Sequence, residues 1–193
     1  MFVISCHADT GFRSHKLERL PNGLLRGHLD NFSGVYAVMK AYFSGRMHQN
    51  YLRIELTYGE EVDMAGAKQV LETLAPEDVV AVVDVTGTPT DRDFVIEKCR
   101  NDALRGFLRE ALGSLSFDIY AECPDPISTY DEADVYSQRC KNVFFLGVPV
   151  AGGDYNAGPV ACRERSIDAV SEAICIIAER FPELCRACGL PQP

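Results

Sequence analysis

The sequence predicts an α/β fold with three layers, in which helices cover both faces of a mostly parallel or mixed central sheet. Strand-like and helix-like segments alternate along the chain, and such alternation is typical of a sheet whose two faces are both covered. The stretch DVVAVVDVT, residues 78–86, is almost continuously apolar and rich in Val. A run of this kind indicates a strand that is buried on both faces.

In the first half of the chain, residues 1–5 (MFVIS) are expected to form a strand. Residues 12–29 are polar and contain Gly and Pro, so a loop or a short hairpin is expected there. Residues 30–45 predict a helix, because apolar side chains recur at helical spacing, the first four residues offer capping oxygens and Gly45 can end it. The remaining elements of this half are a strand at 52–58, a helix at 64–74 before Pro76, and the strand at 78–86.

The second half continues the same alternation. Its expected elements are a strand at 94–99, an amphipathic helix at 101–115, strands at 117–123 and 142–150, and a long helix at 166–181 that closes the chain. The sequence contains no internal repeat, low-complexity tract or linker. We therefore expect residues 1–193 to form a single domain without an inserted lid or dimerisation domain.

Composition narrows the class of protein. The apolar content of 47% and the charged content of 24% are ordinary for a globular domain. The formal net charge of −9, without any basic cluster, argues against nucleic acid or an anionic membrane as a partner. The N-terminal stretch lacks the basic region and cleavage site of a signal peptide, and no apolar run is long enough to span a membrane. We expect a cytoplasmic protein.

The eight cysteines do not predict a disulfide framework, because a chain of this length can build a core and a reducing compartment is expected. Most of them are expected to act as small buried apolar residues. Cys185 and Cys188 form a C-x-x-C pair, for which a zinc or redox role is the alternative to simple packing. The chain has no second pair of this kind, so packing is favoured.

A histidine and an acid stand directly after the first expected strand. His7 and Asp9 are two residues apart, so in an extended chain their side chains point to the same side. The carboxylate could fix the tautomer of a metal-binding imidazole and increase its basicity. The alternative is a histidine at a strand end that only forms a hydrogen bond with a nearby acid.

Further acids occur where other elements begin or end. Asp30 starts the expected helix at 30–45, Glu60 and Glu61 follow the strand at 52–58, and Asp84 lies near the carboxyl end of the apolar strand. Ligands of open α/β sheets gather at these strand ends. Several carboxylates close together cannot all stay ionised unless a cation joins them. A mixture of imidazole and carboxylate ligands suits zinc.

The order of these motifs resembles the zinc-dependent aminopeptidase and deacylase superfamily, the co-catalytic metallopeptidases with a mixed α/β core. The patterns of that family are H-x-D, D-N or D-D, G-E-E before a helix of small residues, and an apolar strand that ends in Asp. They read here HAD, HLDNFSG, YGEEVDMAGA and VVDVTGT. The stretch DEADVYSQRCKNVFFLGVP resembles the family's segment that leads into its G-I-P strand, so the likeness covers about residues 2–170.

The resemblance implies four metal ligands. His7 and Asp84 would bind one zinc ion, Glu61 would bind a second, and Asp30 would bridge the two. The alternative is a related fold whose acids survive only as solvated loop residues.

The resemblance also implies two catalytic roles. Asp9 would orient the ring of His7, and Glu60 would be the general base that takes a proton from the attacking water. A metal that acidifies water, together with a carboxylate outside the ligand set, is a coherent hydrolytic arrangement.

The last ligand of the family, a histidine in the pattern G-Y-H-T-x-x-E-R, has no counterpart here. The matching segment GPVACRER, residues 158–165, has Val160 in that position, and the only histidines are residues 7, 15, 28 and 48. Cys162 could replace the imidazole as a thiolate or could be a packed thiol, and Asp154 is another candidate.

One zinc site with three protein ligands and a place for water is therefore expected, while the second site is doubtful. The sequence predicts a metal-dependent hydrolase of peptide or N-acyl amide bonds, acting on a peptide or an N-acylated amino acid, and it is compatible with a homo-oligomer. The alternative is a catalytically inactive binding or regulatory protein on the same scaffold.

Overall fold

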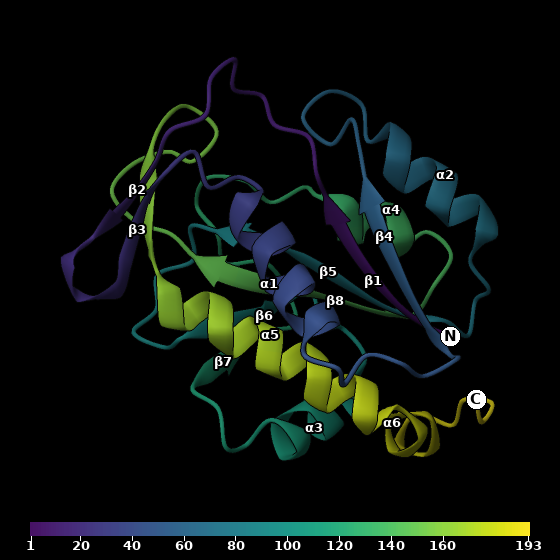
Figure 1. Ribbon diagram of the computed structural model, residues 1–193. Coiled ribbons are helices and arrows are strands. Elements are labelled where there is room, and N and C mark those ends of the chain that lie inside the picture. The colour runs from purple at the N-terminus through teal and green to yellow at the C-terminus, as the bar shows by residue number, and fades with distance from the viewer.

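A six-stranded sheet with the order β4-β1-β5-β8-β6-β7 forms the centre of the computed structural model, which describes residues 1–193 (Figure 1). Its strands are β4 (Leu52–Thr57), β1 (Phe2–His7), β5 (Val79–Thr86), β8 (Asn142–Pro149), β6 (Phe94–Glu97) and β7 (Phe117–Ile119). The first four are parallel to one another, whereas β6 is antiparallel to β8 and parallel to β7. The predicted mostly parallel, mixed sheet is confirmed.

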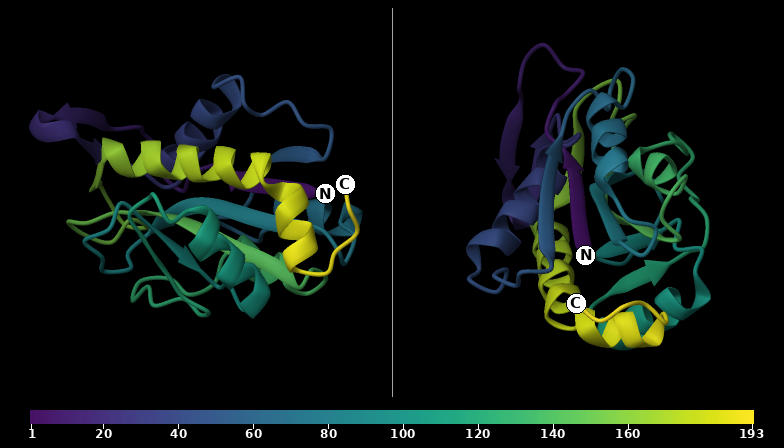
Figure 2. Two further views of the ribbon diagram at one scale, coloured as in Figure 1. Left: turned by 90° about the horizontal axis from the view of Figure 1, so that it is seen from below. Right: turned by 90° about the vertical axis from the view of Figure 1, so that its right-hand side faces the viewer.

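Helices cover both faces of this sheet, as Figure 2 shows. One face carries α1 (Phe32–Phe43), α3 (Asp102–Ala111), α5 (Glu164–Glu179) and α6 (Phe181–Ala187), and the other carries α2 (Ala65–Thr73) and α4 (Glu132–Tyr136). The core beneath the first group contains 36 buried residues and the core beneath the second contains 13. The strand β5 contributes to both cores because all of its residues are buried, as its apolar run predicted.

The segment at residues 12–29 contains a hairpin, which was one of its two predicted forms. The strands β2 (Leu17–Leu20) and β3 (Leu24–Gly27) are joined by a short 3₁₀ turn at Pro21–Gly23. Asn22 and Gly23 both have positive φ there, at 65° and 70°, which Gly and Asn tolerate better than other residues. A third strand, β9 (Val160–Arg163), pairs with β3 and leads directly into α5. The sequence analysis did not predict this strand.

The strand expected at 117–123 is wrong beyond residue 119. Its neighbour β6 ends at Glu97, because Lys98 turns the chain with a φ of 54°. Beyond Ile119 the two segments keep only irregular backbone hydrogen bonds, such as that from Cys99 to Tyr120, so β7 does not continue as a regular strand.

The expectation that the helix at 166–181 closes the chain is also wrong. Pro182 cannot continue α5, since it has no N–H to donate within a helix. It stands instead in the first turn of a separate helix, α6, where that missing donor costs nothing.

All eight cysteines are free thiols, and six of them are buried. Cys185 is a buried residue of α6, and Cys188, which is half-buried, follows the last residue of that helix. None of the helices combines the length and apolar character that crossing a membrane requires.

Candidate metal centre

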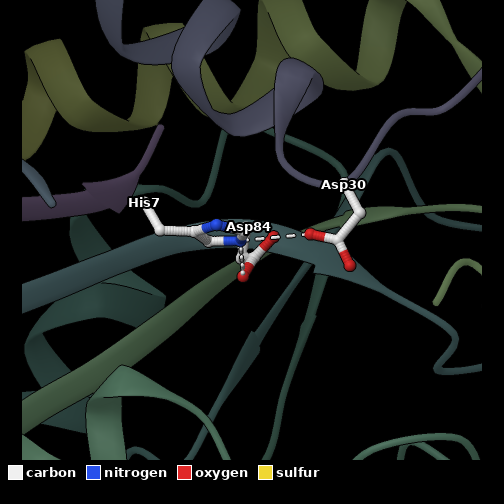
Figure 3. Close-up of side chains that lie close together, drawn as sticks. All are labelled: His7, Asp30 and Asp84. Atoms are coloured by element: carbon white, nitrogen blue, oxygen red, sulfur yellow. Dashed lines mark hydrogen bonds and ion pairs between the residues drawn. The ribbon is translucent and has the colours of Figure 1, made fainter. Parts of the chain in front are cut away.

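Three of the predicted residues meet at the carboxyl ends of β1 and β5 (Figure 3). His7 is the last residue of β1, Asp84 lies near the end of β5, and Asp30 precedes Asn31, the N-cap of α1. The Nε2 atom of His7 lies 3.1 Å from Asp30 Oδ1 and 3.2 Å from Asp84 Oδ2. Their side chains are only 1%, 7% and 10% exposed, respectively. One imidazole and two carboxylates thus face a single buried point.

The local sequence explains how Asp30 reaches this point. Asn31 caps α1 by accepting the backbone N–H of Gly34 at 2.9 Å, and its amide donates to the carbonyl of Val83 at 2.9 Å. The beginning of α1 is thereby tied to β5 one residue before Asp84. Gly34 permits this approach, because a Cβ atom at that position would lie 2.7 Å from the Val83 carbonyl oxygen.

Glu60 and Glu61 reach the same region from the turn after β4. A carboxylate oxygen of each lies within 4.8 Å of a ring nitrogen of His7 and of the other carboxylate. The backbone of Gly11 lies close to Glu61, since a Cβ atom on Gly11 would be 3.1 Å from Glu61 Oε2. The loop after β1 therefore packs against this carboxylate.

Asp9 lies on the other side of the His7 ring. Its Oδ1 atom is 3.5 Å from His7 Nδ1, which is the distance of an ion pair rather than of a good hydrogen bond. Both atoms are buried without a hydrogen-bond partner. The ring thus presents Nε2 to the two aspartates and Nδ1 to Asp9.

The geometry of this group fits a divalent metal. Zinc bound by nitrogen and oxygen at about 2.0–2.2 Å in a tetrahedron separates its ligand atoms by roughly 3.3 Å. The two distances from His7 Nε2 are close to this value, and the donor atoms of His7, Asp30 and Asp84 all lie within 4.8 Å of one another. The residues present therefore suit zinc in number, type and spacing.

In the metal-free protein, protons bound to His7 and to the buried carboxyl groups reduce the repulsion between the acids of the site. Burial lowers the pKa of the His7 imidazole, but the negative charges of Asp84 and Asp30 outweigh it and raise the pKa to about 12. Burial raises the pKa of Glu60 to about 7, and the charges of Asp30 and Glu61 act in the same direction. Burial likewise raises the pKa of Asp84.

These shifts predict how the stability of the metal-free protein depends on pH. The pKa of folded Glu60, about 7, lies above its ordinary value of 4.5. Its protonated form therefore stabilises the fold below pH 4.5, and this contribution is lost as the pH rises through 7. Glu60→Gln removes the titration. We expect the unfolding free energy of the wild type, relative to this variant, to fall between about pH 5 and pH 8 in urea titrations with EDTA. A difference that does not change with pH would contradict this assignment.

The pocket beside this point is narrow and acidic. Its volume is about 30 Å³, which is enough for a water molecule or an ion. Six acids line it: Asp30, Glu60, Asp84, Glu97, Asp125 and Asp131. No Lys or Arg side chain lines it, so the pocket attracts cations.

Three of these acids were not predicted. Glu97 ends the apolar run FVIE of β6, and a charged residue at the end of such a run is the same signal that identified Asp84. Asp125 and Asp131 lie in the irregular segment before α4, where no periodic pattern marks them. Lys98 forms an ion pair with Asp131, with Nζ 2.8 Å from Oδ2.

The three candidates for the lost histidine position, Asp154, Val160 and Cys162, do not line this pocket. Val160 is 1% exposed and pairs with Gly27 in a second, three-stranded sheet formed by β2, β3 and β9. Cys162 is buried with its Sγ atom 3.8 Å from Ser33 Oγ, and burial raises the pKa of its thiol to about 11, so it is a packed thiol. Asp154 is exposed and accepts the backbone N–H of Asn156 at 2.9 Å.

Tyr155 and Asn156 line the pocket instead. Both residues belong to the segment between β8 and β9, which the sequence analysis did not single out apart from Asp154.

No protein-family model matches this sequence, and no curated protein is similar to it. Solved structures with the same fold do exist. An aminopeptidase from Desulfurococcus kamchatkensis is 15% identical, with a TM-score of 0.72 over 91% of this chain and 54% of that chain. The Pyrococcus horikoshii TET1 peptidase is 16% identical, with a TM-score of 0.67 over 86% of this chain and 53% of that chain.

A Thermotoga maritima protein described as an endoglucanase is also similar, with 13% identity and a TM-score of 0.64 over 90% of this chain and 55% of that chain. The chain therefore spans about half the length of these proteins. Because proteins described by different activities share the architecture, the fold alone does not determine the reaction. The predicted resemblance is confirmed at the level of architecture: this chain has the α/β fold of the aminopeptidases.

Proposed function

We propose that this chain binds one zinc ion through His7, Asp30 and Asp84 and hydrolyses peptide or N-acyl amide bonds. The observation that carries the proposal is the buried arrangement around His7 Nε2, with carboxylate oxygens at 3.1 and 3.2 Å. It occurs at the carboxyl ends of parallel strands, where α/β sheets place their ligands. The aminopeptidase fold of the chain supports the same reaction class.

A bound zinc ion would polarise the carbonyl of the scissile amide and acidify the attacking water. The protein supplies the proton transfer. Glu60 lines the pocket beside Asp30 and Asp84, and a carboxylate outside the ligand set can serve as the general base. It would take the proton of the attacking water and deliver it to the leaving amine. Asp9, which faces Nδ1, would keep the imidazole in the tautomer that offers Nε2.

We propose a single tightly bound zinc ion rather than two. Glu61 and Asp30 could contribute to a second site, but no histidine lines the pocket to supply the further imidazole that the resemblance requires, and the nearby Asn156 offers only an amide. An uncharged amide is a weaker zinc ligand than imidazole, since zinc prefers Cys, His and carboxylate donors.

A second candidate function is a binding or regulatory protein without catalysis on the same scaffold. It is favoured by the ability of His7 to close the site without a metal, because its imidazolium lies between Asp30 and Asp84. In that case the residues would form a structural ion-pair network.

We further propose that residues 1–193 act as one domain, since both cores pack on the same sheet. Eight free thiols support a cytoplasmic location. A homo-oligomer is also proposed, because the TET1 peptidase with the same fold assembles into a tetrahedron or an octahedral shell.

Zinc content tests the proposal. We expect the purified chain to retain about one zinc ion per chain after it has been loaded with zinc and dialysed to remove free metal. The metal content can be measured by inductively coupled plasma mass spectrometry. No bound zinc would favour the non-catalytic alternative, and two tightly bound ions would contradict the single-site assignment. Hydrolysis of leucine p-nitroanilide, compared with that of N-acetylleucine, would then separate the peptide from the N-acyl substrate class.

A further inference from the structure

The segment between β8 and β9 reaches the acidic pocket through one buried aromatic side chain. Tyr155 is 6% exposed, whereas Gly152, Gly153, Asp154 and Asn156 around it are exposed. The Tyr155 hydroxyl donates a hydrogen bond to Asp125 Oδ2 at 2.8 Å. The contact joins this segment to the wall of the pocket.

Asp125 is a firmly held acceptor. Its Oδ2 atom also accepts the backbone N–H of Gly87 at 2.7 Å and the hydroxyl of Thr86 at 3.3 Å, and its Oδ1 atom accepts the N–H of Ile127 at 2.7 Å. Thr86 is the last residue of β5. The anchor for Tyr155 is therefore attached to the strand that carries Asp84.

The rest of the segment has few other attachments. The hydrogen bonds of residues 152–158 connect Asp154 with residues 156, 157 and 158 within the segment itself. Backbone hydrogen bonds to neighbouring elements occur only outside residues 152–158, where Ala151 pairs with Ala161. Gly152 and Gly153 have positive φ, at 97° and 156°, so they add no stiffness. The bond from Tyr155 to Asp125 is the one side-chain hydrogen bond between residues 152–158 and the rest of the protein.

We propose that Tyr155 is a positioning residue, whose hydrogen bond to Asp125 holds residues 152–158 against the pocket and keeps Asn156 at the pocket wall. Asn156 shares that wall with Asp30 and Glu60, and its amide offers both a donor and an acceptor to a substrate. The consequence for substrate binding rests on the proposed function; the position of the segment does not.

The chemistry of the contact agrees with this role. Burial and the neighbouring Asp125 raise the pKa of the Tyr155 hydroxyl well above its usual range. The hydroxyl therefore keeps its proton and remains a donor at neutral pH. A hydrogen bond to a carboxylate is stronger than one between neutral groups, so a single bond of this kind can hold a short segment.

The variant Tyr155→Phe removes the hydroxyl and keeps the buried ring. Tyr51→Phe is the matched control, because the Tyr51 hydroxyl donates to the carbonyl of Ala178 at 3.1 Å, away from the pocket. We expect hydrogen exchange of the amides of residues 156–158, which donate to Asp154, to be about tenfold faster in Tyr155→Phe and unchanged in Tyr51→Phe when followed by mass spectrometry. Unchanged exchange in Tyr155→Phe would overturn the proposal.

Kinetics provide a readout that a general loss of stability would not reproduce. For leucine p-nitroanilide we expect KM to rise about tenfold in Tyr155→Phe with kcat altered about twofold or less, since a substrate contact is displaced while the zinc ligands stay in place. Zinc content should remain that of the wild type. A loss confined to kcat, or a loss of zinc, would contradict the positioning role.

A double-mutant cycle identifies Asp125 as the partner. If Tyr155 acts through Asp125, the exchange rate of residues 156–158 in Asp125→Asn should not increase further when Tyr155→Phe is added. An additive increase would show that Tyr155 acts by another route. Asp125→Asn changes a buried group, so a variant that does not fold leaves the decision to the exchange of Tyr155→Phe. If the wild type neither binds zinc nor hydrolyses amides, the proposed function fails, and the exchange measurement still decides the role of Tyr155.

Discussion

Replacing His7 with Ala is expected to weaken zinc binding by more than about 100-fold, because the loss of residues behind a metal ligand already costs about 10- to 100-fold. His7 is the single nitrogen donor of the group and lies opposite both aspartates. Without it, Asp30 and Asp84 would face each other as two buried acids, which is unfavourable for both. The affinity can be measured by competition with a chromogenic zinc chelator.

His15→Ala is the control for this experiment, because His15 is exposed on the loop before β2. It should bind zinc as the wild type does. Equal zinc affinity of the His7→Ala variant and the wild type would show that the metal, if bound, lies elsewhere. Asp9→Asn should have a smaller effect, since Asp9 lies behind the ring at Nδ1 and is not among the three converging donors.

Replacing Glu60 with Gln is expected to reduce turnover by about 10²- to 10⁴-fold, which is the usual contribution of a positioned general base. The amide has almost the same shape as the carboxylate but cannot accept the proton of the attacking water. Zinc binding should persist, because His7, Asp30 and Asp84 remain. The measurement is kcat for leucine p-nitroanilide, with zinc content determined on the same preparation.

Glu72→Gln controls for the change of charge, because Glu72 is exposed on α2. Turnover by Glu60→Gln at the wild-type rate would remove Glu60 from the mechanism. Loss of zinc together with activity would mean that Glu60 is a metal ligand, an arrangement that its proximity to Glu61 and His7 also permits.

The sequence by itself determined the architecture and three of the residues that meet in the centre. The apolar run of β5 predicted a strand buried on both faces, and Asp84 interrupts that run near its end. His7 and Asp30 were found in the same way, at the end of a strand and at the start of a helix. These signals are local: periodicity, capping and the end of an apolar run depend on residues close together in the chain.

Only the tertiary structure decided how the pocket is completed. Asp125 reaches the end of β5 by a hydrogen bond to the backbone of Gly87, and nothing near Asp125 in the sequence announces this contact. Asn156 lines the pocket, while Val160 is paired with Gly27 in the second sheet. Val160 is kept in the three-stranded sheet by the pairing of β9 with β3, whereas Asn156 follows Tyr155, whose hydroxyl is bound to Asp125.

Contacts between distant segments also explain why the strand expected at 117–123 is shorter than predicted. The strand expected at 117–123 ends at Ile119, because Lys98 turns the neighbouring β6 and the regular pairing of the two strands stops there. Pairing between distant segments therefore decided where that strand ends and which side chains face the pocket. Local preferences of the chain cannot encode such choices, because their free energy comes from contacts that exist only after the segments have met.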